Sequence, residues 1–158
     1  MIIRKITEKD NEQMAIIIRN SLVECKAAKP GTVYFDSTTD NLSELFKTKK
    51  SCYYVIVING SIAGGAGFYP TEGLPPSVCE LVKMYISKEY RGRGWGNMLL
   101  QKCFDEARKQ GYKKMYLESM PELNNAIAMY LKNGFNHIPT SLGNSGHTGC
   151  DVWMMRDL

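Results

Sequence analysis

A glycine-rich segment at residues 91–96, Arg-Gly-Arg-Gly-Trp-Gly, lies between a strand-like stretch and a helix-like stretch. Residues 78–86 alternate in polarity, which is typical of a strand. The stretch after the glycines ends at Gly111 and places its apolar side chains on one helical face: Leu99, Leu100, Cys103 and Ala107. Residues 114–120 have strand character again. Two strands joined through one helix are parallel and form a right-handed crossover, so the chain needs a sheet with a parallel pair.

The rest of the chain indicates antiparallel strands and amphipathic helices. Asn59-Gly60 lies between the strand-like residues 52–58 and 62–69, and this dipeptide is a strong hairpin signal. The same patterns predict three further strands and three further helices: strands at 2–6, 135–138 and 150–156, and helices around 14–22, 42–46 and 122–133. The predicted fold class is α+β, with one mixed sheet and helices packed on it.

Length and composition favour one ordinary folded domain spanning residues 1–158. A domain averages roughly 150 residues, and 44% hydrophobic with 23% charged residues excludes disorder. The longest apolar run, residues 53–58, is far shorter than the roughly 20 residues of a membrane span. The N-terminus lacks a secretory pattern, so we expect a cytoplasmic protein. Five cysteines without a Cys-x-x-Cys pair argue against a disulfide framework and a zinc knuckle.

The glycine-rich segment is suited to binding a phosphate. Its glycines allow backbone N–H groups to converge on an anion at a helix N-terminus, and Lys88, Arg91 and Arg93 add positive charge. The alternative is a tight turn with a solvated basic face. A dinucleotide fingerprint fails because Asn97 stands where the third glycine would be needed. A nucleotide-triphosphate loop fails because no Gly-Lys-Ser/Thr follows Gly96.

The pattern Arg/Gln-x-x-Gly-x-Gly/Ala does fit residues 91–96, and here the chain resembles the GCN5-related N-acetyltransferase (GNAT) family. Residues 80–86, Glu-Leu-Val-Lys-Met-Tyr-Ile, are similar to the family's fourth strand. Residues 125–135 are similar to its Asn-x-x-Ala-x-x-x-Tyr helix ending in Gly-Phe, although Ala and Tyr lie slightly closer together here. The resemblance implies a mixed, mostly antiparallel sheet with a splayed parallel strand pair and helices on both faces.

The resemblance also implies an acetyl-CoA site. The pyrophosphate would lie on the glycine-rich loop, and the pantetheine arm would contact the main chain of the fourth strand and the start of the later helix. The implied cofactor-binding residues are Met84, Ile86, Arg91, Gly92, Arg93, Gly94, Trp95, Gly96 and Asn125. Asn125 has an alternative role as a helix-start residue beside Asn124, and the side chains of Met84 and Ile86 have an alternative role in the core.

Direct acetyl transfer to an amine requires a base, an oxyanion donor and an acid. The resemblance implies that Glu80 takes the amine proton, the Met84 N–H stabilises the oxyanion, and Tyr130 protonates the thiolate. The alternatives are a solvent-facing or ion-paired carboxylate at Glu80, with water as the base, and a buried aromatic side chain at Tyr130. No metal is expected, because His137, His147 and Cys150 are loosely spaced for zinc ligands.

The expected partner is a small-molecule amine or a peptide or protein amine, and the loops at 26–40 and 69–77 and the loop before Cys150 are expected to line its site. Asp36, Asp40 and Glu72 are candidates for attracting it. A formal charge of +4 is too small for a dedicated nucleic-acid binder, and neither nucleic acid nor membrane is expected as a partner. Because members of the family that the chain resembles are often dimers, the resemblance also implies a homodimer as a candidate assembly. The alternative function is a non-catalytic acyl-CoA-binding or sensor domain.

Overall fold

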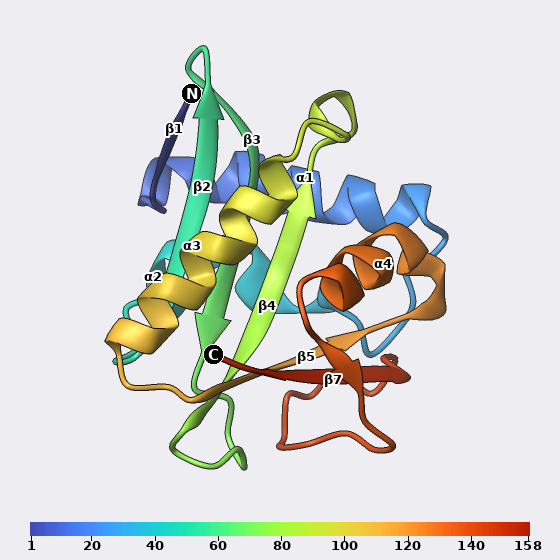
Figure 1. Cartoon of the computed structure of the whole chain (residues 1–158). Coiled ribbons are helices and arrows are strands. Elements are labelled where there is room, and N and C mark those ends of the chain that lie inside the picture. The colour runs from blue at the N-terminus through green and yellow to red at the C-terminus, as the bar shows by residue number, and fades with distance from the viewer.

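The computed structural model describes residues 1–158 and contains one seven-stranded sheet in the order β1-β2-β3-β4-β5-β7-β6 (Figure 1). Every neighbouring pair is antiparallel except β4 and β5, which are parallel. Helix α3 connects these two strands, so the expected crossover is present. The mixed sheet with one parallel pair confirms the predicted fold class.

The elements follow the order expected from the sequence. The strands are β1 (Ile2–Lys5), β2 (Cys52–Ile58), β3 (Ser61–Tyr69), β4 (Val78–Ile86), β5 (Lys114–Ser119), β6 (Asn136–His137) and β7 (Val152–Asp157). The helices are α1 (Asn11–Glu24), α2 (Leu42–Leu45), α3 (Trp95–Lys109) and α4 (Asn124–Lys132). Asn59 and Gly60 have φ of 50° and 84°, as the tight β2–β3 hairpin requires. The segment 26–40, expected to be a loop, contains one short 3₁₀ turn, Val33–Phe35, and most of a second, Ser37–Asn41.

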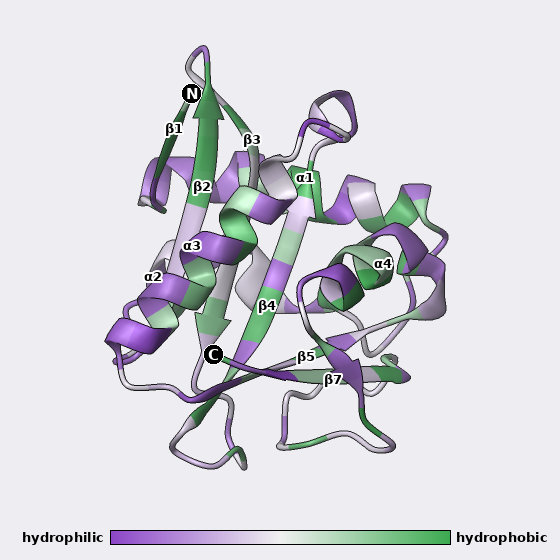
Figure 2. Ribbon diagram, viewed as in Figure 1, coloured by the Kyte–Doolittle hydropathy of each residue, from purple (hydrophilic) through white to green (hydrophobic).

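The sheet is covered on both faces, and each face has its own hydrophobic core. Helix α3 lies against β2, β3 and β4 on one face, and α1 packs against β3 and β4 on the other (Figure 1). Leu99, Leu100, Cys103 and Phe104 of α3 are fully buried in the first core. Met14, Ile18 and Leu22 of α1 are fully buried in the second. Figure 2 shows mixed colours along the helices and hydrophobic stretches along β2 and β4, as expected for amphipathic helices on a buried sheet.

Two other sequence expectations concern cysteines and membranes. All five cysteines are free thiols, and Cys52, Cys79 and Cys103 are buried. None of the helices combines the length and the apolar character that crossing a bilayer would require.

Candidate active site

The parallel strands β4 and β5 separate in the middle of the sheet. Their pairing ends at Leu81 and Leu117, although β4 continues to Ile86 and β5 to Ser119. Beyond this point, the side of β4 that would face β5 has no neighbouring strand. The separation opens the sheet and exposes main-chain groups of β4 to a ligand.

A bulge in β4 accompanies this separation. The pairing with β3 shifts register between Gly65 and Gly67, opposite Lys83, which has a left-handed φ of 51°. The Tyr53 hydroxyl donates a 2.6 Å hydrogen bond to the Lys83 carbonyl and holds the bulge in place. A Cβ at Gly65 or Gly67 would lie 2.5 or 2.6 Å from the Tyr53 ring, so these glycines make room for it. A lysine with positive φ costs about 1–2 kcal/mol, and the surrounding contacts must maintain it.

A cavity of about 570 Å³ occupies the opening between the strands. Its walls come from β4 residues 80–86, the glycine-rich loop, residues 117–120 at and just after the end of β5, α4, and His147 and Cys150 of the loop before β7. All the site residues predicted from the sequence line it except Arg93. Its size and its mixture of apolar and polar walls are typical of a small-molecule site.

The glycine-rich loop forms one end of this cavity. The backbone N–H groups of residues 92–97 donate to no group of the chain. Gly92 and Gly94 have φ of 74° and 80°, and a Cβ at either position would meet no atom within 4 Å. Free N–H donors at the N-terminus of α3 carry partial positive charge, which favours an anion such as a phosphate. Gly96 lies against Met129, where a Cβ would be 3.1 Å from the sulfur.

The arginines of the loop have other side-chain partners. The Arg91 guanidinium donates to the Ile86 carbonyl, the Glu24 carboxylate and the Ser21 hydroxyl, which fixes the loop to β4 and α1. The Arg93 guanidinium lies 5.4 Å from the Trp95 ring centroid. In this conformation the Arg91 guanidinium is engaged within the chain, whereas the backbone N–H groups of the loop and the Arg93 guanidinium, which makes no hydrogen bond or ion pair, are free to meet an anion.

Glu80 lies on β4 inside the cavity wall and is 2% exposed. Thr71 donates a hydrogen bond to one of its carboxylate oxygens, and no lysine or arginine lies within ion-pair distance. Burial raises the pKa of Glu80 to about 7; the nearby Glu118 carboxylate also raises it, and Thr71 opposes the shift. A carboxyl group with a pKa near neutrality can both accept and release a proton at physiological pH.

Helix α4 contributes Tyr130 and Asn125 to the wall of the same cavity. Tyr130 is 7% exposed, its ring packs edge-to-face against Phe135 at a centroid distance of 5.7 Å, and its hydroxyl has no hydrogen-bond partner in the chain. Burial raises the pKa of Tyr130, so the phenol stays protonated. Asn125 is exposed at the cavity rim, and its side chain makes no hydrogen bond within the chain. Met84 and Ile86 line the cavity, where a ligand could reach them, and they also pack against the hydrophobic core.

The acidic residues expected to attract an amine have other partners. Asp36 accepts a 2.6 Å hydrogen bond from the buried Lys83 ammonium, and Asp40 pairs with Arg19 at 2.6 Å. Burial raises the pKa of Asp36, but its bonds with His147 and Lys83 outweigh this effect and hold the pKa far below the usual range.

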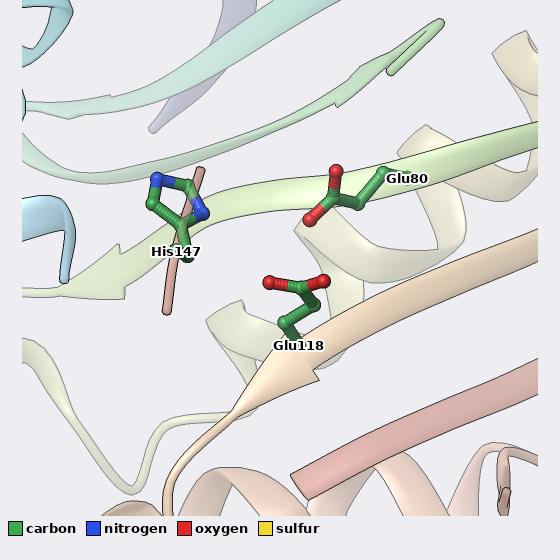
Figure 3. Close-up of side chains that lie close together, drawn as sticks. All are labelled: Glu80, Glu118 and His147. Atoms are coloured by element: carbon green, nitrogen blue, oxygen red, sulfur yellow. The ribbon is translucent and has the colours of Figure 1, made fainter. Parts of the chain in front are cut away.

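Glu118 on β5 is the site residue that the sequence reading missed. It lines the cavity beside Glu80, and Figure 3 shows both carboxylates together with the His147 ring. The signal in the sequence was weak: a carboxylate that directly follows the apolar residues 115–117 of β5. His147, from the loop before β7, also lies in the cavity wall.

Comparisons with known proteins agree on one family. The model of the Acetyltransferase (GNAT) family matches residues 17–135. The chain is 35% identical over 158 residues to the uncharacterized N-acetyltransferase YjgM of Escherichia coli K12, and the match covers 99% of this chain and 95% of that protein.

Solved structures show the same fold. A GNAT-family acetyltransferase from Staphylococcus aureus Mu50 superposes with a TM-score of 0.82 at 18% identity, covering 99% of this chain and 98% of that one. The PaiA N-acetyltransferase from Thermoplasma acidophilum, solved in complex with coenzyme A, gives a TM-score of 0.78 at 18% identity and the same coverage.

Proposed function

The chain belongs to the GNAT family of acetyltransferases and is an acetyl-CoA-dependent N-acetyltransferase, and from this premise we propose that it transfers the acetyl group directly to a primary amine in a ternary complex. The observation that carries the proposal is one cavity that joins free loop N–H groups at one end to the buried Glu80 at the other. The carboxylate and the anion-binding loop thus face one space, in which two substrates can meet.

The proposed acetyl-CoA site uses main-chain groups more than side chains. The N–H groups of Gly92 to Gly96, including that of Arg93, bind the pyrophosphate, and Trp95 forms part of the same wall. Arg91 keeps the loop in its binding conformation through Glu24 and Ser21. The main chain of Met84 and Ile86, which faces no strand on the β5 side, pairs with the pantetheine arm, and Asn125 contacts it from α4.

The proposed base is Glu80, acting directly or through a water molecule. An alkylamine has a pKa of about 10.4 and arrives protonated, so a proton must leave before the nitrogen can attack the thioester carbonyl. The burial of Glu80 favours uptake of that proton near neutrality. The Met84 N–H lies at the bulge beside Lys83, where β4 leaves its regular pairing, and we assign it to the developing oxyanion.

Tyr130 is the proposed acid. As the C–N bond forms and the C–S bond breaks, the departing sulfur gains negative charge, and the free Tyr130 hydroxyl donates its proton to it. Direct transfer is favoured over an acyl-cysteine, because burial raises the pKa of Cys150 in the same cavity to about 12. At neutral pH this residue is a thiol and therefore a poor nucleophile.

The first test is a calorimetric titration of acetyl-CoA into the wild-type protein and into Gly94→Ala. The positive φ of Gly94 strains an alanine at this position and shifts the free N–H groups of the loop, and we expect binding to weaken at least ~10-fold through loss of N–H contacts. The matched control is Gly60→Ala in the β2–β3 hairpin. Gly60 also has a positive φ of 84° and no atom within 4 Å of a Cβ, but it lies outside the cavity.

Both alanine variants should lose about 1–2 kcal/mol of stability from backbone strain, and only Gly94→Ala should lose acetyl-CoA affinity. Equal affinities in the two variants would refute the loop as the pyrophosphate site. A screen of small amines and peptides with free-thiol release as the readout then identifies the acceptor. Binding of acetyl-CoA without thiol release for any acceptor would favour the sensor function.

A further inference from the structure

We propose that Glu80, Glu118 and His147 form a binding site for a first-row divalent transition metal such as Zn²⁺ at the acceptor end of the cavity. One potential ligand atom from each residue lies within 4.8 Å of the other two. Figure 3 shows the two carboxylates facing each other from β4 and β5, with one ring nitrogen of His147 turned toward them. The three residues come from chain segments that meet only in the folded protein.

The carboxylates in this cluster lack a cation. Asp36 is paired with Lys83, and Glu122, elsewhere in the cavity, is paired with Lys29. Glu80 and Glu118 have no lysine, arginine or histidine nitrogen within 4 Å, although Glu80 is 98% buried. A buried carboxylate (Glu80) and a half-buried one (Glu118) that face each other repel, and a bound cation would relieve this repulsion.

Glu80 supplies an independent sign of a ligand. Only one of its carboxylate oxygens accepts a hydrogen bond, from the Thr71 hydroxyl, and the other oxygen has no donor in the chain. This residue is almost completely buried, and it lines the cavity together with Glu118 and His147. The chain does not enclose this free oxygen, because its open side is the cavity itself, where a ligand can reach it.

Side chains behind the cluster orient its ligands. Glu118 accepts hydrogen bonds from the Tyr116 hydroxyl at 2.8 Å and the Ser145 hydroxyl at 2.7 Å. The Nε2 atom of His147 lies 3.5 Å from the Asp36 carboxylate, which leaves Nδ1 to face the glutamates. A carboxylate behind a ligating histidine is the common arrangement in metal sites, because it fixes the ring and its tautomer.

The donor set selects the kind of metal. One imidazole nitrogen with two carboxylate oxygens suits Zn²⁺ and its first-row neighbours, whereas Mg²⁺ and Ca²⁺ prefer oxygen ligands alone. Ligand atoms about 2.1 Å from a tetrahedral Zn²⁺ lie about 3.4 Å apart, so atoms that are now within 4.8 Å of one another must close by at most about 1.4 Å.

The site would have a regulatory consequence that rests on the proposed function. A metal ion on Glu80 would occupy the proposed base and fill the acceptor end, while the glycine-rich loop would stay free for acetyl-CoA. We therefore expect Zn²⁺ to compete with the amine acceptor and to leave acetyl-CoA binding unchanged.

The test is a calorimetric titration of Zn²⁺ into the full chain in a buffer that does not chelate metals. Glu118→Gln and His147→Ala each remove one ligand, and we expect each to weaken Zn²⁺ binding by at least ~10–100-fold, the loss typical of even an outer partner. The matched control is Glu122→Gln, which changes a carboxylate of the same cavity outside the cluster and should keep wild-type affinity.

Acetyl-CoA titration of the same samples verifies that each variant is folded. Because this titration does not depend on Zn²⁺, it also separates a failure of the proposed metal site from a failure of the proposed transferase function. Absence of Zn²⁺ binding, or equal binding by Glu118→Gln, His147→Ala and the wild type, would overturn the site. A Co²⁺ spectrum with thiolate charge-transfer bands would also overturn it, by moving the metal to the cysteines. Inhibition by Zn²⁺ with any acceptor from the amine screen should disappear in His147→Ala.

Discussion

Removing the hydroxyl of Tyr130 separates its chemical role from its role in packing. Tyr130→Phe keeps the ring, its burial and its contact with Phe135, and it deletes an oxygen that has no partner in the chain. The free energy of unfolding should therefore change by less than about 0.5 kcal/mol, because no intramolecular hydrogen bond is lost. If the hydroxyl is the acid, kcat should fall by about 10²-fold or more, the usual contribution of a general acid. Tyr130→Ala would instead cost about 3–5 kcal/mol and would confuse the two roles.

The assay is thiol release under saturating acetyl-CoA with an acceptor from the amine screen, alongside urea unfolding and acetyl-CoA titration of the same variant. We expect unchanged stability, unchanged acetyl-CoA affinity and a large loss in kcat. Because burial raises the pKa of Tyr130, the wild-type rate should show no loss from deprotonation of this phenol up to about pH 10. A Tyr130→Phe enzyme with kcat within threefold of wild type would refute the acid role and leave Tyr130 as a packing residue.

Two further predictions concern the framework of the site. Tyr53→Phe should lower the free energy of unfolding by about 1–3 kcal/mol and weaken acetyl-CoA binding, because the buried Lys83 carbonyl loses its hydrogen-bond donor and the β4 bulge loses its anchor. Urea unfolding measures the change in stability, and calorimetry measures the change in affinity. An unchanged acetyl-CoA affinity would show that the bulge keeps its conformation without the Tyr53 hydroxyl. The pKa of Asp10 is lowered to about 2 by its hydrogen bonds with Arg4, so this pair should stabilise the fold above about pH 4 and lose its contribution as the pH falls toward 2. The Arg4 side chain is 39% exposed, so we expect the pair to contribute about 1–2 kcal/mol, measured as the difference in unfolding free energy between pH 6 and pH 2.5. Asp10→Asn should flatten this pH dependence, and an equally steep curve in the variant would exclude the pair as its cause.

Several elements of this fold could be predicted because their signals are local. The Asn59-Gly60 turn demands positive φ at adjacent residues, and both angles are observed. The residues of the glycine-rich loop, placed between a strand and an amphipathic helix, predicted an anion site at the start of α3, and the free N–H groups are found there. Backbone conformation and helix periodicity depend on neighbours within a few residues, so one sequence is enough to reveal them.

Side-chain directions around the loop could not be predicted. Arg91 and Arg93 were expected to add positive charge at the loop, and the sequence did not indicate that Arg91 would bond Glu24 and Ser21 of α1 or that Arg93 would lie near the Trp95 ring. The partners of Arg91 lie 67 and 70 residues away along the chain. No local pattern in the sequence indicates such distant contacts.

The sequence by itself determined the order of the elements, the parallel crossover, the glycine-rich loop and the identity of Glu80 and Tyr130 as candidates. The tertiary structure alone decided that β4 leaves β5 after Leu81, and that Glu118 and His147 join Glu80 at the resulting cavity. The physical reason is that local propensities depend on adjacent residues, whereas a buried electrostatic environment depends on every strand and loop that packs around it. The charge and the geometry of the acceptor end therefore exist only once the sheet has formed.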